Sequence, residues 1–172
     1  YRRYCDRERR YGNSFIIRCY YIFSDKSECA SWFRKFKNIW NDRKVVIVEG
    51  ERSHSGVGND LFEDAVSVER IICPAHDAYR VKDRIIEACR AYDAEHMFLL
   101  ALGPAAKPIA EQLFLDGYRV IDIGNLDLEY EWYLHGEKKK VTLAKHDIIG
   151  EEANRRAGYS EYLEQIKTSI SL

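Results

Sequence analysis

Acidic side chains gather in one short segment of the chain. Asp122, Asp127, Glu129 and Glu131 fall within ten residues, directly after an apolar run. Asp127 and Glu129 are two positions apart, so both would point the same way in an extended backbone. Mg²⁺ and Mn²⁺ prefer carboxylate oxygens, and an ion carried by a diphosphate needs only one or two from the protein. Such an ion would neutralise charge on a leaving diphosphate.

A plainer interpretation of these acids stays open. The chain has 28 Asp and Glu residues, so acid-x-acid pairs arise by chance. Asp127 and Glu129 could simply begin a helix, whose dipole favours acidic side chains in the first turn. What favours a metal site is the position after the last apolar run, where ligands bind in α/β sheets.

A glycine loop at residues 55–60 is the second candidate site. Gly56 and Gly58 permit positive φ and leave backbone N–H groups uncovered, so the loop could hold a phosphate. It is not a dinucleotide fingerprint, because Leu61 stands where the third glycine belongs and no ribose-binding acid follows the next strand. No Gly-Lys-Ser/Thr follows either. An ordinary turn that needs glycine is the alternative.

Gly103 and Pro104 form a further turn of small residues. Pro104 suits the first position of a helix, whose N-terminus could face an anion. A tight turn with a favourable helix start is the competing interpretation.

Short apolar runs and helical patterns alternate along the chain and would position these loops. The runs at 45–48, 70–73, 97–102 and 120–123 predict strands. Helical spacing predicts helices over 26–40, from 77 and from 104, and a short helix over 60–66. Residues 14–23 predict a strand followed by a loop. This alternation indicates an α/β fold: a single Rossmann-like domain with a mainly parallel sheet and helices on both faces.

Composition bounds the function. The 172 residues are 46% hydrophobic and carry a formal net charge of −1, so no basic field points to nucleic acid. No apolar stretch is long enough for a membrane span, and no signal peptide is visible. The five cysteines lack metal-binding spacing and indicate reduced thiols in a cytoplasmic protein.

Several motifs, in order, resemble one family. They are 48–53 with 55–62, 70–75, 101–106 and 121–132, within a match over about 11–145. Together they resemble the GT-D fold glycosyltransferases, long known as a domain of unknown function. The resemblance implies metal-dependent transfer of a sugar from a UDP-sugar, typically UDP-glucose, with Mn²⁺ or Mg²⁺. The acceptor would be a glycan on a bacterial glycoprotein or a polysaccharide precursor, and a homodimer is possible.

The resemblance also assigns residues. The family's Asp-x-Glu motif falls on Asp127 and Glu129, which would bind the metal. Glu129 or Glu131 would orient or deprotonate the acceptor hydroxyl. The nucleotide would lie against a set of loop residues: Arg52, Ser55, Gly56, Val57, Gly58, Asn59, Asp60, Gly103 and Pro104.

The family pattern begins with an upstream Gly-Asp-Gly-Glu segment that does not occur here, and the chain starts at Tyr1. We therefore expect an N-terminally truncated domain. Its parts would be a residual N-terminal segment (1–23), the glycosyltransferase core (24–145) and a C-terminal helical extension (146–172). The alternatives are a Rossmann-like module for another nucleotide, as in dehydrogenases or methyltransferases, and an inactive fragment.

Overall fold

The sheet at the centre of the molecule is parallel throughout. The computed structural model describes residues 6–10, 15–143, 145 and 157–172. Within them one five-stranded sheet has the order β4-β3-β1-β2-β5. The strands are β1 (Lys44–Gly50), β2 (Ser67–Cys73), β3 (Met97–Ala101), β4 (Arg119–Asp122) and β5 (Ile166–Ser169). All four strand pairs are parallel, which confirms the predicted fold class.

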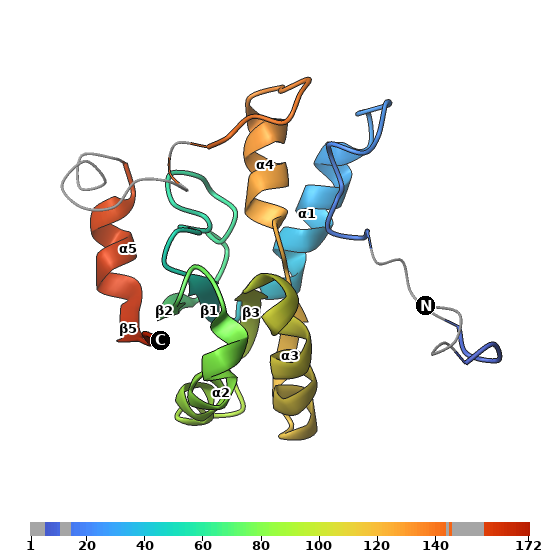
Figure 1. Ribbon diagram of the computed structural model, residues 1–172. Coiled ribbons are helices and arrows are strands. Elements are labelled where there is room, and N and C mark those ends of the chain that lie inside the picture. The colour runs from blue at the N-terminus through green and yellow to red at the C-terminus, as the bar shows by residue number, and fades with distance from the viewer. Residues whose placement is uncertain (1–5, 11–14, 144, 146–156) are drawn as a thin grey trace.

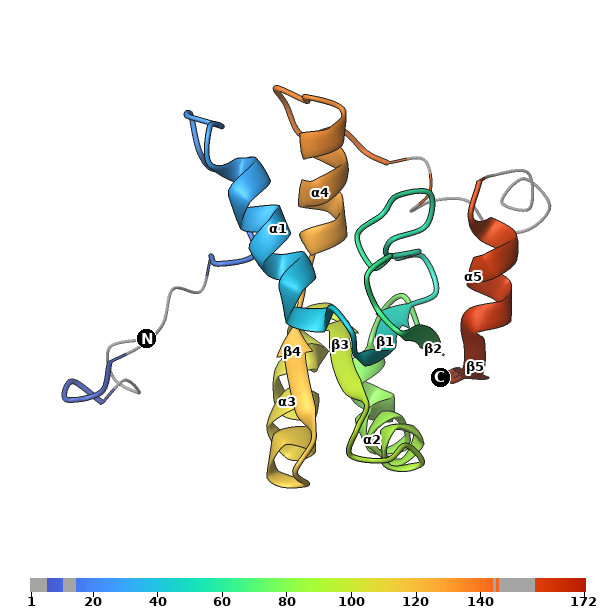
Figure 2. The ribbon, with the colours of Figure 1, turned by 180° about the vertical axis from the view of Figure 1, so that it is seen from behind.

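Helices cover both faces of this sheet (Figures 1 and 2). One face carries α1 (Cys29–Trp40) and α4 (Leu126–Leu134), and the other carries α2 (Lys82–Arg90) and α3 (Ala106–Leu115). The short 3₁₀ turns η1 (Ala78–Val81) and η2 (Gly103–Ala105) lead into α2 and α3. A last helix, α5 (Tyr159–Gln165), runs directly into β5.

The central strand β1 explains why its sequence is a continuous apolar run. Val46 and Val48 pack in the core under α2 and α3. Val45 and Ile47 pack in the core under α1 and α4. Successive side chains of a strand point to opposite faces, so a strand covered on both sides needs no polar alternation.

Two predicted elements are wrong. Residues 60–66 form turns and no helix, because their carbonyls have other partners. The indole Nε1 of Trp40 donates to the carbonyl of Leu61 at 2.9 Å. The N–H of Asp42 donates to the carbonyl of Asp64. Residues 15–23 form turns and irregular backbone instead of a strand; two of their N–H groups bond to carbonyls within the segment, and two bond to a carboxylate described below.

The C-terminal segment contributes more than the predicted helical extension. Its residues 146–156 lie outside the described part of the chain, whereas β5 is a full member of the sheet and pairs with β2. The N–H of Ile170 also donates to the carbonyl of Ile72 at 2.8 Å. The last described residues therefore belong to the α/β core.

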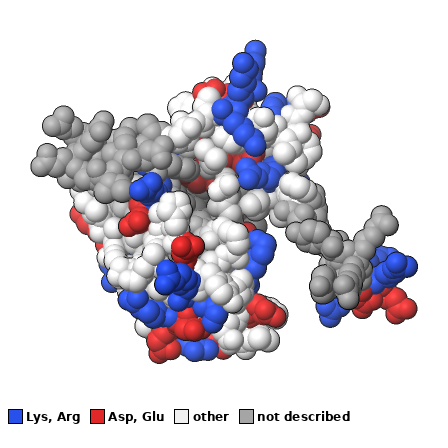
Figure 3. Space-filling model, in the orientation of Figure 1, with Lys and Arg blue, Asp and Glu red and all other residues white. Residues whose placement is uncertain are grey.

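The surface carries both signs of charge. Figure 3 shows lysine and arginine side chains interspersed with acidic ones on the lower part of one face. Of the helices in the described ranges, none is long and apolar enough to cross a membrane. Cys19, Cys29, Cys73 and Cys89 are free thiols, and all four are buried.

Candidate functional site

The glycine loop follows β1 and depends on both of its glycines. Gly56 and Gly58 have φ of +77° and +79°, a region that side-chain-bearing residues rarely adopt. A Cβ on Gly56 would lie 2.4 Å from the ring of Phe62. On Gly58 it would lie 3.5 Å from the carbonyl of Ala157. Gly56 is therefore needed for both the conformation and the close packing of the loop, and Gly58 for its conformation.

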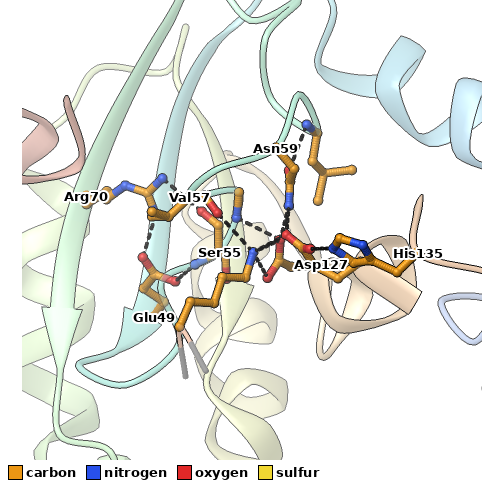
Figure 4. A network of polar contacts seen from close by, with 11 residues as sticks. Glu49, Ser55, Val57, Asn59, Arg70, Asp127 and His135 are labelled. Carbon is orange, nitrogen blue, oxygen red and sulfur yellow. Dashed lines mark hydrogen bonds and ion pairs between the residues drawn. The ribbon is translucent and has the colours of Figure 1, made fainter. Parts of the chain in front are cut away.

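A buried ion pair supports the loop from the sheet (Figure 4). Glu49 of β1 and Arg70 of β2 form a salt bridge, and both side chains are almost fully buried. The second oxygen of Glu49 accepts the N–H of Ser55 at 2.8 Å. Arg70 donates to the carbonyl of Ser55 at 2.9 Å and to Oε1 of Gln165 at 2.7 Å. The start of the loop is thus fixed to β1, β2 and α5 at once.

Asp127 joins the glycine loop to α4. Its Oδ1 accepts the N–H of Gly56 and the amide Nδ2 of Asn59, each at 2.9 Å. The same amide nitrogen also donates to Oε1 of Glu131 at 2.6 Å. The two segments that the sequence singled out, the glycine loop and the acidic cluster, are therefore in direct contact at the carboxyl edge of the sheet.

Lys145 completes this contact and was not predicted. Its ammonium lies 2.9 and 2.8 Å from the two oxygens of Asp127. It also lies 2.7 Å from Oε1 of Glu131 and donates to the carbonyl of Val57 at 3.2 Å. We call Lys145, Asp127, Glu131 and Asn59 the lysine cluster. No periodic pattern around residue 145 signals this role.

Glu129 faces away from the lysine cluster. The expectation that it shares a direction with Asp127 is wrong, because both residues lie in α4 and not in extended backbone. Two helical positions turn the side chain by about 200°. Both oxygens of Glu129 instead hold the segment 15–23: Oε2 accepts the N–H groups of Tyr20 and Tyr21 at 3.0 and 2.8 Å, and Oε1 pairs with Arg18 at 3.2 Å.

A cleft of about 620 Å³ opens at the carboxyl ends of β1, β2 and β3. Of the predicted nucleotide-binding residues, Arg52, Ser55, Gly103 and Pro104 line it, together with Asp127. His76 and Asp77, which follow β2, line it as well. Both could have been predicted from the sequence, because a loop that follows a parallel strand lies at this edge of the sheet.

The remaining loop residues line a neighbouring cavity. Gly56, Val57, Gly58, Asn59 and Asp60 border a hollow of about 400 Å³ between the loop and α5. Glu131 borders a third hollow, of about 290 Å³, with His135 and Lys145. The structure thus divides the predicted nucleotide-binding residues between two cavities on either side of the loop.

The carboxylates differ in their fit to a divalent cation. Asp127 is the carboxylate at the cleft, although it is buried and its oxygens bind the glycine loop and Lys145. Glu129 does not suit one, because Arg18 and two backbone N–H groups occupy its oxygens and it is fully buried. In the described ranges no group of three or more His, Cys, Asp or Glu could hold a metal.

Asp60 connects the loop to α1 and α4. Its carboxylate accepts hydrogen bonds from Lys37 at 2.7 Å and from the hydroxyl of Tyr130 at 2.6 Å. The ammonium of Lys37, followed by the Tyr130 hydroxyl, lowers the pKa of Asp60 from its usual value. Burial, followed by the same hydrogen bond, raises the pKa of Tyr130.

The fold is that of an α/β protein with a cleft at the carboxyl edge of a parallel sheet. The family model for the glycosyltransferase GT-D fold matches residues 1–151. The chain therefore belongs to the GT-D fold glycosyltransferase family.

Named relatives agree with this assignment. A probable glycosyl transferase, Gly, of Streptococcus gordonii is 45% identical over 137 residues, which are 79% of this chain and 20% of that protein. The glycosyltransferase GlyD of Streptococcus pneumoniae is 44% identical over 147 residues, 85% of this chain and 18% of that one. The chain thus spans about a fifth of the length of these relatives.

Solved structures share the fold. One is described as a highly conserved domain of unknown function 1792 with a distinct glycosyltransferase fold; it is 36% identical with a TM-score of 0.83. The match covers 93% of this chain and 59% of that one. A glycosyltransferase (DUF1792) from Streptococcus sanguinis is 38% identical with the same TM-score, covering 93% and 61%.

Proposed function

We propose that this domain transfers a hexose, typically glucose, from a UDP-sugar to a glycan acceptor on a glycoprotein or polysaccharide precursor. Family membership supports sugar transfer. The observation that carries the proposal is the cleft at the carboxyl ends of the strands, which Asp127 borders while it binds the glycine loop. This edge is where parallel α/β sheets bind nucleotides.

The residues that line the cleft would have different roles in binding the donor. Arg52 is the cation on its rim, and Gly103 and Pro104 place the turn before α3 against it. Asp127 would hold a Mn²⁺ or Mg²⁺ ion carried by the diphosphate. When bound, that ion would neutralise the charge that grows on the departing diphosphate.

The acceptor side is assigned to Glu131. Its Oε1 is taken by Asn59 and Lys145, and its Oε2 lies 3.4 Å from Nε2 of His135, at the hollow next to the cleft. A carboxylate in this place could orient an acceptor hydroxyl or take its proton. Glu129, the other predicted candidate, is buried under residues 15–23 and lines none of the cavities described above.

Binding and turnover test the proposal together. We expect UDP to bind in the presence of Mn²⁺ by calorimetry, and UDP-glucose to be consumed with release of UDP. Asp127→Asn should weaken Mn²⁺-dependent UDP binding at least tenfold. The half-buried Asp122 on the sheet edge, which does not line the cleft, offers a control, and Asp122→Asn should change binding less than twofold. Thermal stabilisation by NAD or S-adenosylmethionine, with none by UDP-sugars, would reject the proposed donor.

Location and assembly belong to the same proposal. Four buried free thiols accord with a reducing compartment, and we propose a cytoplasmic site of action. A homodimer stays a prediction, which light scattering on the purified chain would check.

A further inference from the structure

Tyr79 is an exposed aromatic residue that lines the cleft at the carboxyl ends of the strands. Its side chain belongs to the cleft wall, and the residue is 58% exposed. Within the described ranges no second aromatic ring packs against it. The ammonium of Lys82 lies 5.9 Å from the centroid of its ring, at the outer limit of a cation–π contact. The ring therefore adds little to the core and is accessible from the cleft.

The turn η1 keeps this ring out of the core. Ala78 and Val81 are three positions apart, so they share one face of a 3₁₀ turn, and both are buried under α2 and α3. Tyr79 follows Ala78 directly and lies on another face. Asp77, before the turn, has a left-handed φ of +56°, and its carbonyl accepts the N–H of Arg80 at 2.8 Å. Strained backbone of this kind is concentrated at ligand sites.

Tyr79 and Asp127 follow strands on opposite sides of the cleft. Tyr79 comes after β2 and Asp127 after β4, and β1 and β3 stand between these strands in the sheet. Three strand spacings separate β2 from β4, which is about 14 Å. The turn η2, with Gly103 and Pro104, contacts η1. A ligand that reaches both sides must therefore extend across the ends of β1 and β3.

A nucleotide sugar matches this distribution of side chains. Arg52, in the loop after the central strand β1, offers a cation to a diphosphate in the middle of the cleft. The sugar has to lie toward α4, because the acceptor side is assigned to Glu131 of that helix. The base is then left for the β2 side, where Tyr79 offers a flat ring. Stacking of a base on an aromatic ring contributes about 1 to 3 kcal/mol.

We propose that Tyr79 is the ring on which the base of the donor nucleotide stacks, so that the donor lies across the strand ends with its base at η1 and its sugar toward α4. This inference rests on the proposed UDP-sugar donor. Stacking tolerates any base, so Tyr79 contributes affinity and not the choice of uracil. Because the ring does not touch the reacting atoms, its loss should raise KM and leave kcat nearly unchanged.

Calorimetric titration with two ligands, in the presence of Mg²⁺, tests this assignment. Tyr79→Ala should bind UDP at least fivefold more weakly than wild type, whereas Tyr79→Phe keeps the ring and should stay within twofold. Pyrophosphate carries no base, so its affinity should stay within twofold in both variants. Phe114 of α3 is the control, because it is 71% exposed and does not line the cleft. Phe114→Ala should change UDP binding less than twofold.

Unchanged UDP binding by Tyr79→Ala would overturn the inference, and so would an equal loss for UDP and pyrophosphate. A loss for UDP-glucose without one for UDP would place the ring against the sugar and would also overturn it. Since Tyr79 is exposed, the variant should unfold at the same urea concentration as wild type. If Tyr79→Ala fails to fold, Tyr79→Leu takes its place, and failure of both would make the ring part of the core.

The inference and the proposed function fail in different ways. A wild-type protein that binds no UDP rejects the proposed donor, and the inference with it. UDP binding that is insensitive to Tyr79→Ala rejects the inference alone. UDP binding that depends on Tyr79, with no turnover of UDP-glucose, rejects the proposed transfer and leaves the stacking in place.

Discussion

The backbone N–H of Gly56 donates to Oδ1 of Asp127 at 2.9 Å, although 71 residues separate them in the sequence. The bond ties a loop after β1 to the first turn of α4, at the same edge of the sheet. Since this N–H already has an acceptor within the protein, it holds the loop in place next to the cleft that Asp127 and Ser55 line.

Gly56→Ala should destabilise the protein by about 2 to 4 kcal/mol, from left-handed strain and from overpacking. The new methyl group would lie 2.4 Å from the Phe62 ring. Gly136 is the matched control, because its φ is +64° and no atom lies within 4 Å of its added Cβ. Gly136→Ala should cost only about 1 to 2 kcal/mol. Equal costs in urea denaturation would show that the contact with Phe62 does not matter.

Arg70→Met should cost about 3 to 5 kcal/mol, because it leaves the carboxylate of Glu49 buried without its charge partner. The double variant Glu49→Gln/Arg70→Met should be less destabilised than the sum of the single variants by about 1 kcal/mol or more. Urea denaturation of the four proteins in the cycle measures this coupling. Strict additivity would argue against a coupled ion pair.

Glu129→Gln should destabilise the fold by about 1 to 3 kcal/mol, since an amide replaces a carboxylate that accepts two backbone N–H groups and pairs with Arg18. In the folded protein, Mn²⁺-dependent UDP binding should stay unchanged. The exposed Glu111 of α3 provides the control, and Glu111→Gln should alter neither quantity. If Glu129→Gln lost metal affinity while it kept the stability of the wild type, Glu129 would be a metal ligand after all.

The pair of Asp60 and Lys37 should stabilise the protein at neutral pH and not in acid. Because the folded state lowers the pKa of Asp60 from 3.8, its contribution is present above that value and is lost as the pH falls through the folded pKa. Half-exposed Asp60 makes this contribution small, below about 1 kcal/mol. Asp60→Asn should therefore be less stable than wild type at pH 7, and the difference should shrink towards pH 3. A constant difference across this range would contradict the assignment.

The sequence predicted four of the five strands, because short β-branched apolar runs strongly favour buried β-strands. Val45 to Val48 could only be a strand covered on both faces, and the rule that ligands bind at carboxyl ends brought the glycine loop and Asp127 together. The same rule could not decide the local backbone of residues 126–134. Acids at 127, 129 and 131 fit an alternating strand by their spacing, yet the segment is a helix.

What the sequence could not show were the partners of buried charges. Glu49 is an acid inside an apolar strand, which indicates a buried partner without identifying Arg70. Lys145 and Gln165 reach their partners through the tertiary fold, across 18 and 95 positions. Strand β5 is only four residues long and alternates in burial, so its signal is weak beside those of β1 and β3.

The position of β5 beside β2 has a consequence for synthesis on the ribosome. Arg70 leaves the exit tunnel long before Gln165, whose side chain accepts its Nε–H. A nascent chain can therefore pair β1 with β2 while the edge of β2 is still bare, and the backbone of that edge gains its partner only when residues 166–169 emerge. Until then the edge is open to strands of other chains, so a chaperone that shields β2 would act in this interval.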